Sequence, residues 1–265
     1  MIRHDLRAGT IWEGDWLQAP LEPGYTMSEV DGPYALGKAA WDKMGVDGLA
    51  DWYRPHLERL TGLMAPSSSV YLWNTAEGWA RLDPEMRRLG WEFRSLIVWD
   101  KMNTAASMAW QKSNKWPVTH EVCGFYVCGG PFFSATDARS VWSLAIQGWA
   151  EERVVTGTNR PGAKNQNGVG CTVSDALHPC QKPLLFAERM VQASTRPGDR
   201  VLVPFGGTCR IATYLERLRR MEPENARYHD SCELNSDGKD YLSAVLGRMG
   251  EDTGKAGQMS LFGAR

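Results

Sequence analysis

The segment between residues 200 and 233 constrains the fold more than any other part of the chain. Arg200–Val203 predicts a short strand, Phe205-Gly206-Gly207 a loop, and residues 208–220 a helix before a further strand that ends at Glu233. Glycines allow a tight turn and the close approach of a ligand. A carboxylate after the second strand is suited to the two hydroxyls of a ribose. The segment therefore predicts a nucleotide-binding βαβ unit.

The same alternation of strands and helices continues through most of the chain. Strands are predicted at 9–15, up to Val30, and at 69–73, 95–99 and 122–127, and helices at 47–64, 79–89, 183–195 and from about 237. This order is typical of an α/β fold with a mostly parallel sheet covered by helices on both faces. Ligands bind such sheets at the carboxyl ends of the strands. Since Asp15, Asp31, Gly206 and Glu233 each follow a predicted strand, we expect them on one rim.

Residues 129–175 differ in character from the rest. They are rich in Gly, Ser, Thr, Asn and Gln and include Trp142 and Trp149. Such composition indicates an irregular insertion or a small subdomain, without core elements. We therefore divide the chain into four parts, which are 1–128, the insertion at 129–177, a second half at 178–250 and a flexible tail at 251–265.

Composition limits the class of protein. With 43% hydrophobic and 23% charged residues the chain can form a globular core. Its net charge of −1 means that any nucleic acid must be bound by a local basic surface. The six cysteines include no Cys-x-x-Cys pair, which indicates reduced thiols and no metal site. No apolar run is long enough for a membrane span, so we expect a soluble, intracellular protein.

Several short motifs occur in an order that is typical of one enzyme family. Asp31-Gly32-Pro33-Tyr34 taken alone reads as a turn. In context it resembles the Asp-Pro-Pro-Tyr motif of the DNA amino-methyltransferases. Residues 178–183, 197–208 and 232–235 resemble the cofactor region of that family. Because the catalytic motif precedes the cofactor loop, the resemblance is to the circularly permuted β class, with a Rossmann-like methyltransferase fold.

The resemblance implies a role for each of these residues. The Asp31 carboxylate and the Gly32 carbonyl would accept the two N–H bonds of a base amino group, in the turn completed by Pro33, and Tyr34 would stack on the extruded base. S-adenosyl-L-methionine would be the cofactor, with its adenine at Asp15 and its ribose at Glu233. The rest of the cofactor would contact His178, Lys182, Phe205, Gly206, Gly207 and Thr208.

Three positions depart from the family pattern. Gly32 replaces a proline, which removes rigidity. Val203 replaces an aspartate near the methionine end of the cofactor, and Thr208-Cys209-Arg210 puts bulk where the backbone would approach closely. These departures motivate a second hypothesis, a nucleic-acid-binding relative without catalytic activity.

The preferred interpretation is a DNA methyltransferase for adenine N6, because Asp31 begins the motif. Cytosine N4 is the near alternative, and an RNA or protein amide a further one. The partner would be double-stranded DNA, recognised through polar residues of the insertion. Residues 258–262 resemble a peptide that docks into the bacterial sliding clamp. The resemblance also suggests a homodimer and the cytoplasm of a bacterium, or a phage origin.

Overall fold

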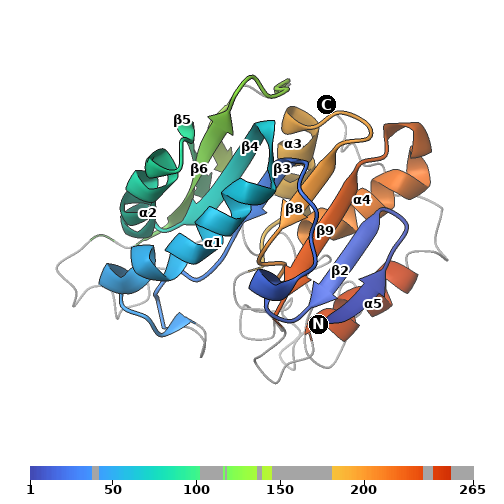
Figure 1. The fold of residues 1–265 in the computed structure, drawn as a ribbon, viewed down its shortest axis with the longest axis horizontal. Coiled ribbons are helices and arrows are strands. Elements are labelled where there is room, and N and C mark those ends of the chain that lie inside the picture. Colours follow the sequence, from blue (N-terminus) through green and yellow to red (C-terminus); the bar gives the residue numbers. More distant parts are fainter. Residues whose placement is uncertain are drawn as a thin grey trace.

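A nine-stranded sheet runs through the molecule in the order β1-β2-β9-β8-β3-β4-β6-β5-β7 (Figure 1). The structure is a computed structural model and describes residues 1–37, 42–101, 116, 118–135, 139–144, 181–234 and 241–251. The strands are β1 (Ile2–Asp5), β2 (Gly9–Glu13), β3 (Tyr25–Val30), β4 (Met64–Asn74), β5 (Glu92–Asp100), β6 (His120–Cys128), β7 (Val141–Ser143), β8 (Arg200–Val203) and β9 (Tyr228–Glu233).

Most neighbouring strands are parallel, as the sequence predicts. The exceptions are β6, which is antiparallel to both β4 and β5, and β1, which is antiparallel to β2 at the edge. The edge strand β1 was not foreseen. It is short and mostly exposed, and therefore lacks a clear apolar alternation.

Helices cover both faces of the sheet (Figure 1). They are α1 (Leu49–Leu63), α2 (Ala76–Arg88), α3 (Leu184–Ser194), α4 (Arg210–Met221) and α5 (Tyr241–Glu251). Alternate residues of β4 show the two faces, because Leu72 packs with α1 and α2 whereas Trp73 packs with α3 and α4. This alternation is the period of a strand that is buried on both sides.

At the centre of the sheet, between β3 and β8, the connections to the next strands lead toward opposite edges of the sheet. From β3 the chain passes through α1 to β4, and from β8 it passes through α4 to β9 on the opposite side. The strands β3 and β8 pair in parallel, with Met27 opposite Val201 and Ser28 opposite Leu202. Their carboxyl ends therefore flank a crevice of the kind in which α/β proteins bind ligands.

Residues 141–143 belong to the main sheet, so the prediction that 129–175 contains no core element was wrong. Strand β7 pairs in parallel with β5. Trp142 is buried, and its ring lies 5.0 Å from the ring of Phe186. A three-residue strand is too short to produce a recognisable pattern. Most of the remaining insertion, with Trp149, lies outside the described residues, as do His178 and the tail segment 258–262.

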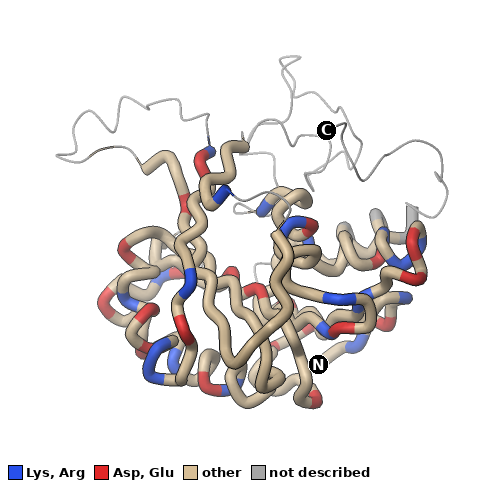
Figure 2. Tube along the Cα trace, turned by 90° about the horizontal axis from the view of Figure 1, so that it is seen from above, with Lys and Arg blue, Asp and Glu red and all other residues tan. Residues whose placement is uncertain are grey.

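Charged residues of both signs are intermixed along the described trace (Figure 2). Within the described ranges, no helix is long and apolar enough to cross a membrane. The same part of the chain contains no group of three or more His, Cys, Asp or Glu residues that could hold a metal ion.

We predict that Phe186→Ala destabilises the fold strongly. Phe186 is fully buried, stacks on Trp73 at 5.7 Å and contacts the ring of Trp99 edge-on at 5.3 Å. Its removal should lower the free energy of unfolding by about 3–5 kcal/mol in urea titrations. The matched change Phe133→Ala, at a half-exposed ring, should cost only about 0.5 kcal/mol. Equal losses in the two variants would contradict this picture of the core.

Candidate active site

A pocket of about 410 Å³ opens at the carboxyl ends of β3 and β8. Its walls include the loops after β2, β3, β8 and β9, which are far apart in sequence. Asp15, Asp31, Gly206 and Glu233 all line it. The structure therefore brings together the four residues that the strand pattern places on one rim.

The turn Asp31–Tyr34 is held from behind by a buried carboxylate. Asp42 is 2% exposed and accepts hydrogen bonds from the backbone N–H groups of Tyr34 at 2.8 Å, Ala35 at 2.7 Å and Leu36 at 3.1 Å. Three N–H groups on one carboxylate fix the backbone, because leaving any of them unpaired in the interior is costly. Ala35 has a left-handed φ of 59°, which such a clamp can maintain.

Gly32 is a steric requirement of this chain. A Cβ atom at this position would lie 2.5 Å from the Tyr53 hydroxyl and 3.1 Å from the Phe205 ring. The Tyr53 hydroxyl donates to the Pro33 carbonyl at 3.2 Å, and the Asn74 amide donates to the same oxygen at 3.3 Å. The expected loss of rigidity is thus offset by side chains that occupy the space of the missing ring.

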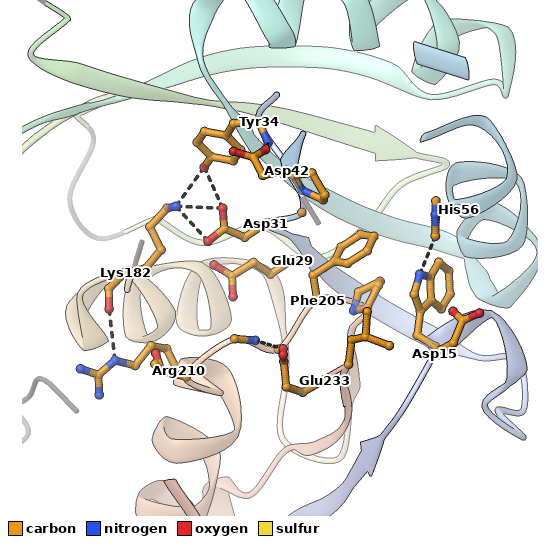
Figure 3. A pocket seen from close by; sticks show the side chains of 18 of the residues that line it. Asp15, Glu29, Asp31, Tyr34, Asp42, His56, Lys182, Phe205, Arg210 and Glu233 are labelled. Atoms are coloured by element: carbon orange, nitrogen blue, oxygen red, sulfur yellow. Dashed lines mark hydrogen bonds and ion pairs between the residues drawn. The ribbon is translucent and has the colours of Figure 1, made fainter. Parts of the chain in front are cut away.

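The carboxylate of Asp31 is bound by a buried lysine (Figure 3). Lys182 donates to both Asp31 oxygens at 2.8 Å and to the Tyr34 hydroxyl at 2.9 Å, and forms an ion pair with Glu121 at 2.9 Å. Tyr34 donates in turn to Asp31 at 2.7 Å. Lys101 forms a second ion pair with Glu121.

These contacts decide the charge states of the network. Burial raises the pKa of Glu121, but Lys182 and Lys101 outweigh burial and hold it at about 2. Burial lowers the pKa of Lys182, yet Asp31 and Glu121 raise it above its usual value. Both groups are therefore charged at neutral pH.

A second carboxylate, Glu29, lines the same wall. It is 6% exposed, and burial together with the nearby Asp31 raises its pKa to about 8, although Lys182 opposes this shift. The register of β3 and β8, continued by one residue, puts Glu29 next to Val203. Val203 itself is buried in the core. Glu29 therefore provides a carboxylate on this pocket wall, although the aspartate of the family pattern is replaced by Val203.

The opposite end of the pocket is aromatic. Trp16, Trp52 and His56 line it together with Phe205, and the His56 ring stacks on Trp52 at 4.2 Å. The Trp16 indole donates to Nδ1 of His56 at 2.7 Å. Burial lowers the pKa of His56 to about 4, so this ring is neutral at pH 7. Asp15 lies at the same end and caps a short 3-10 helix by accepting from the Leu17 N–H.

The glycine loop lies between these two ends. The Gly206 N–H donates to the Cys232 carbonyl at 2.6 Å, and the Gly207 N–H donates to a Glu233 carboxylate oxygen at 2.5 Å. Gly207 has a left-handed φ of 51°, which glycine adopts readily. A single carboxylate therefore both fixes the loop and faces the pocket.

Of the three residues expected to put bulk into the pocket, Cys209 does not, so for this residue the expectation was wrong. Its side chain is buried against Ile11, Ala212, Leu242 and Val245, on the side of α5. A left-handed φ of 51° turns it in this direction. Its neighbours Thr208 and Arg210 line the pocket instead.

The pocket is also lined by the other residues predicted from the sequence, which are Gly32, Pro33, Tyr34, Lys182, Phe205, Gly207 and Thr208. His178 lies outside the described residues. Sequence reasoning put Lys182 with the cofactor, whereas in the structure it is bonded to Asp31. It missed Glu29, Asp42, His56 and Glu121. Asp42 and Glu121 lie in segments that resemble the family, and Glu29 lies two residues before Asp31, where strand residues two apart share a face.

Comparisons with known proteins give one matching family and several solved structures with a similar fold. The sequence profile of a family described as DNA methylase, N6_N4_Mtase, matches residues 26–222. The fold is similar to the PvuII DNA methyltransferase, which is cytosine-N4-specific (TM-score 0.66, 13% identity, 92% of this chain and 86% of that chain). It is also similar to the M1.HpyAVI–SAM complex (TM-score 0.56, 16% identity, 90% of this chain and 98% of that chain). A third similar structure is a putative DNA modification methylase of Thermus thermophilus, TTHA0409, complexed with S-adenosyl-L-methionine (TM-score 0.58, 16% identity, 92% of this chain and 96% of that chain).

We predict that Gly32→Ala distorts the turn that carries Asp31. The added methyl group would overlap the Tyr53 hydroxyl, so the free energy of unfolding should fall by about 1–3 kcal/mol in urea titrations. Removing that hydroxyl should relieve the overlap, and the double variant with Tyr53→Phe should therefore lose less than the sum of the two single changes. Strict additivity would show that Tyr53 does not set the space at residue 32.

Proposed function

Because the chain belongs to the DNA methylase family, we propose that it transfers the methyl group of S-adenosyl-L-methionine to the N6 atom of an adenine in double-stranded DNA. One observation carries this proposal. The turn Asp31–Tyr34 shares a single pocket with the glycine loop and Glu233. A nucleotide-like cofactor and an amino group bound at Asp31 would therefore lie close to each other.

The residues present fit this cofactor. Trp16, Trp52 and Phe205 offer flat apolar contacts for an adenine ring, and Asp15 offers an acceptor for its amino group. Glu233 offers a carboxylate for the ribose hydroxyls. Gly206, Gly207 and Thr208 line the wall between, with His178 as a further expected contact from outside the described residues. When bound, the cofactor supplies a methyl group activated by a sulfonium.

Asp31 and Gly32 would activate the target nitrogen. The lone pair of an exocyclic amino nitrogen is delocalised into the ring, and acceptors on both N–H bonds favour a pyramidal nitrogen with a free lone pair. A carboxylate has about four acceptor positions. Lys182 and Tyr34 use part of this capacity, which leaves room for a bond from the amino group. The Gly32 carbonyl supplies the second acceptor, and the ring of Tyr34 offers a surface for the flipped base.

The network behind Asp31 would hold its carboxylate in place during the reaction. Methylation would leave the target nitrogen with a positive charge and a proton to lose. Asp31, held by Lys182, would be the acceptor for that N–H. Preorganised charges of this kind cost no reorganisation when the reaction occurs.

The choice of adenine rests on Asp31 as the first residue of the motif, and the structural comparisons leave cytosine N4 as the alternative. Two of the sequence departures that motivated the hypothesis of an inactive relative, Gly32 and Cys209, do not disrupt the pocket. Tyr53 and Asn74 support the Gly32 turn, and Cys209 points away from the pocket.

We predict that Asp31→Ala abolishes methyl transfer and spares cofactor binding. Transfer to mixed genomic DNA should fall by about 100-fold or more, because an acceptor at the reacting nitrogen is lost. Calorimetry should show cofactor affinity within about tenfold of the wild type. Asp51→Ala, at an exposed carboxylate, is the matched control and should leave both values unchanged.

The product decides between the candidate functions. Mass spectrometry of digested DNA should show N6-methyladenine, whereas N4-methylcytosine would replace our choice of base. A wild-type protein that binds DNA and fails to bind the cofactor would support the non-catalytic alternative.

We further predict that residues 145–175 determine the site that is methylated. Replacing them with a Gly/Ser linker retains Trp142 and β7, which the core requires. The variant should keep cofactor affinity and lose sequence selectivity, measured by sequencing methylated positions in genomic DNA. Unchanged selectivity would rule out the insertion as the recognition element.

A further inference from the structure

Glu29 places a buried carboxylate on the pocket wall that the proposed transfer step does not use. Its side chain lies in the pocket between Asp31 and Glu233 (Figure 3). A carboxylate that is 6% exposed requires a compensating charge or a proton.

The basic groups beside it are already engaged. An ammonium group has three N–H donors, and Lys182 directs its donors to Asp31, Tyr34 and Glu121. Lys101 pairs with Glu121. Three carboxylates, those of Glu29, Asp31 and Glu121, thus stand against two lysines. Glu29 is the carboxyl group left without a base of its own in this network, so its ionised form would be complementary to a cationic ligand.

The order of groups along the pocket indicates which cation this is. Asp15 and His56 lie at one end, Glu233 in the middle, and Glu29 and Arg210 at the other end (Figure 3). A molecule with adenine at the aromatic end and ribose at Glu233 would extend its amino-acid part to the end with Glu29 and Arg210. That part carries one ammonium and one carboxylate group.

We infer that Glu29 binds the α-ammonium group of S-adenosyl-L-methionine, while the guanidinium of Arg210 and the N-terminus of α4 favour its carboxylate. The inference rests on the proposed function, because it names a contact within the same pocket. Arg210 is fixed at this end by a hydrogen bond from its Nε to the Lys182 carbonyl at 3.1 Å. Glu29 is then a specificity-determining residue, which selects cofactors that retain the amino group.

Proton release would accompany this contact. Groups that face Glu29 are Asp31 after β3, Lys182 before α3 and Cys123 on β6, and burial leaves the pKa of Glu29 at about 8. At pH 7 the carboxyl group is therefore mostly protonated in the free protein. A bound ammonium favours the ionised form, so binding should expel close to one proton at pH 7.

The test compares Glu29→Gln with the wild type by calorimetry at pH 7, using three ligands. S-adenosyl-L-methionine carries a sulfonium and an α-ammonium group. S-adenosylhomocysteine keeps only the ammonium, and methylthioadenosine lacks the amino-acid part. We expect Glu29→Gln to weaken the binding of S-adenosyl-L-methionine and S-adenosylhomocysteine by about 10- to 100-fold, the usual effect of losing a charge-assisted hydrogen bond. The binding of methylthioadenosine should weaken by less than about twofold. Titrations in buffers of different ionisation enthalpy should show proton release with the wild type and little with the variant.

Glu233→Gln is the matched control and should weaken all three ligands, because they share the ribose. Thermal melting of both variants checks that they are folded. Weakened binding of S-adenosyl-L-methionine alone would place Glu29 against the sulfonium and overturn the inference, as would an equal loss for methylthioadenosine or no loss at all. In those cases the proposed function stands. A folded wild-type protein that binds none of the three ligands would overturn both.

Discussion

The buried ammonium of Lys182 is the contact on which the site depends. It joins the end of β3, the start of β6 and the loop before α3 through Asp31, Glu121 and its own backbone. Burying these charges is costly, and the cost is recovered only while every partner is in place. Residues far apart in the sequence therefore line one pocket, and the carboxylate of Asp31 is held by Lys182.

Around this contact, the departures from the family pattern have structural counterparts. The Tyr53 hydroxyl occupies the space that a proline ring would need at Gly32. A carboxylate on β3, Glu29, lines the pocket beside the uncharged Val203 of β8. Cys209 packs toward α5. A binding site is defined by the atoms that face the ligand. Side chains from neighbouring elements can therefore compensate for a changed residue in a motif.

Local sequence patterns predicted the elements that are long, or that are bounded by turn residues. The strand Arg200–Val203 appears as predicted, between Pro197-Gly198-Asp199 and the glycine loop. The residues predicted at the strand ends also meet at one pocket. Strands β1 and β7 were missed, because an exposed edge and a three-residue segment carry too little apolar periodicity. Trp142 illustrates this limit, since only its packing on Phe186 makes it a core residue.

The sequence by itself determined the alternation of strands and helices, the rim on which the polar residues lie and the family to which the motifs belong. These properties follow from neighbours within a few residues, where periodicity and turn chemistry act. The tertiary structure alone decided that β3 lies beside β8, that Lys182 binds Asp31, and that Asp42 and Tyr53 hold the turn. Such contacts join residues from different elements, and no short-range pattern encodes which elements become neighbours.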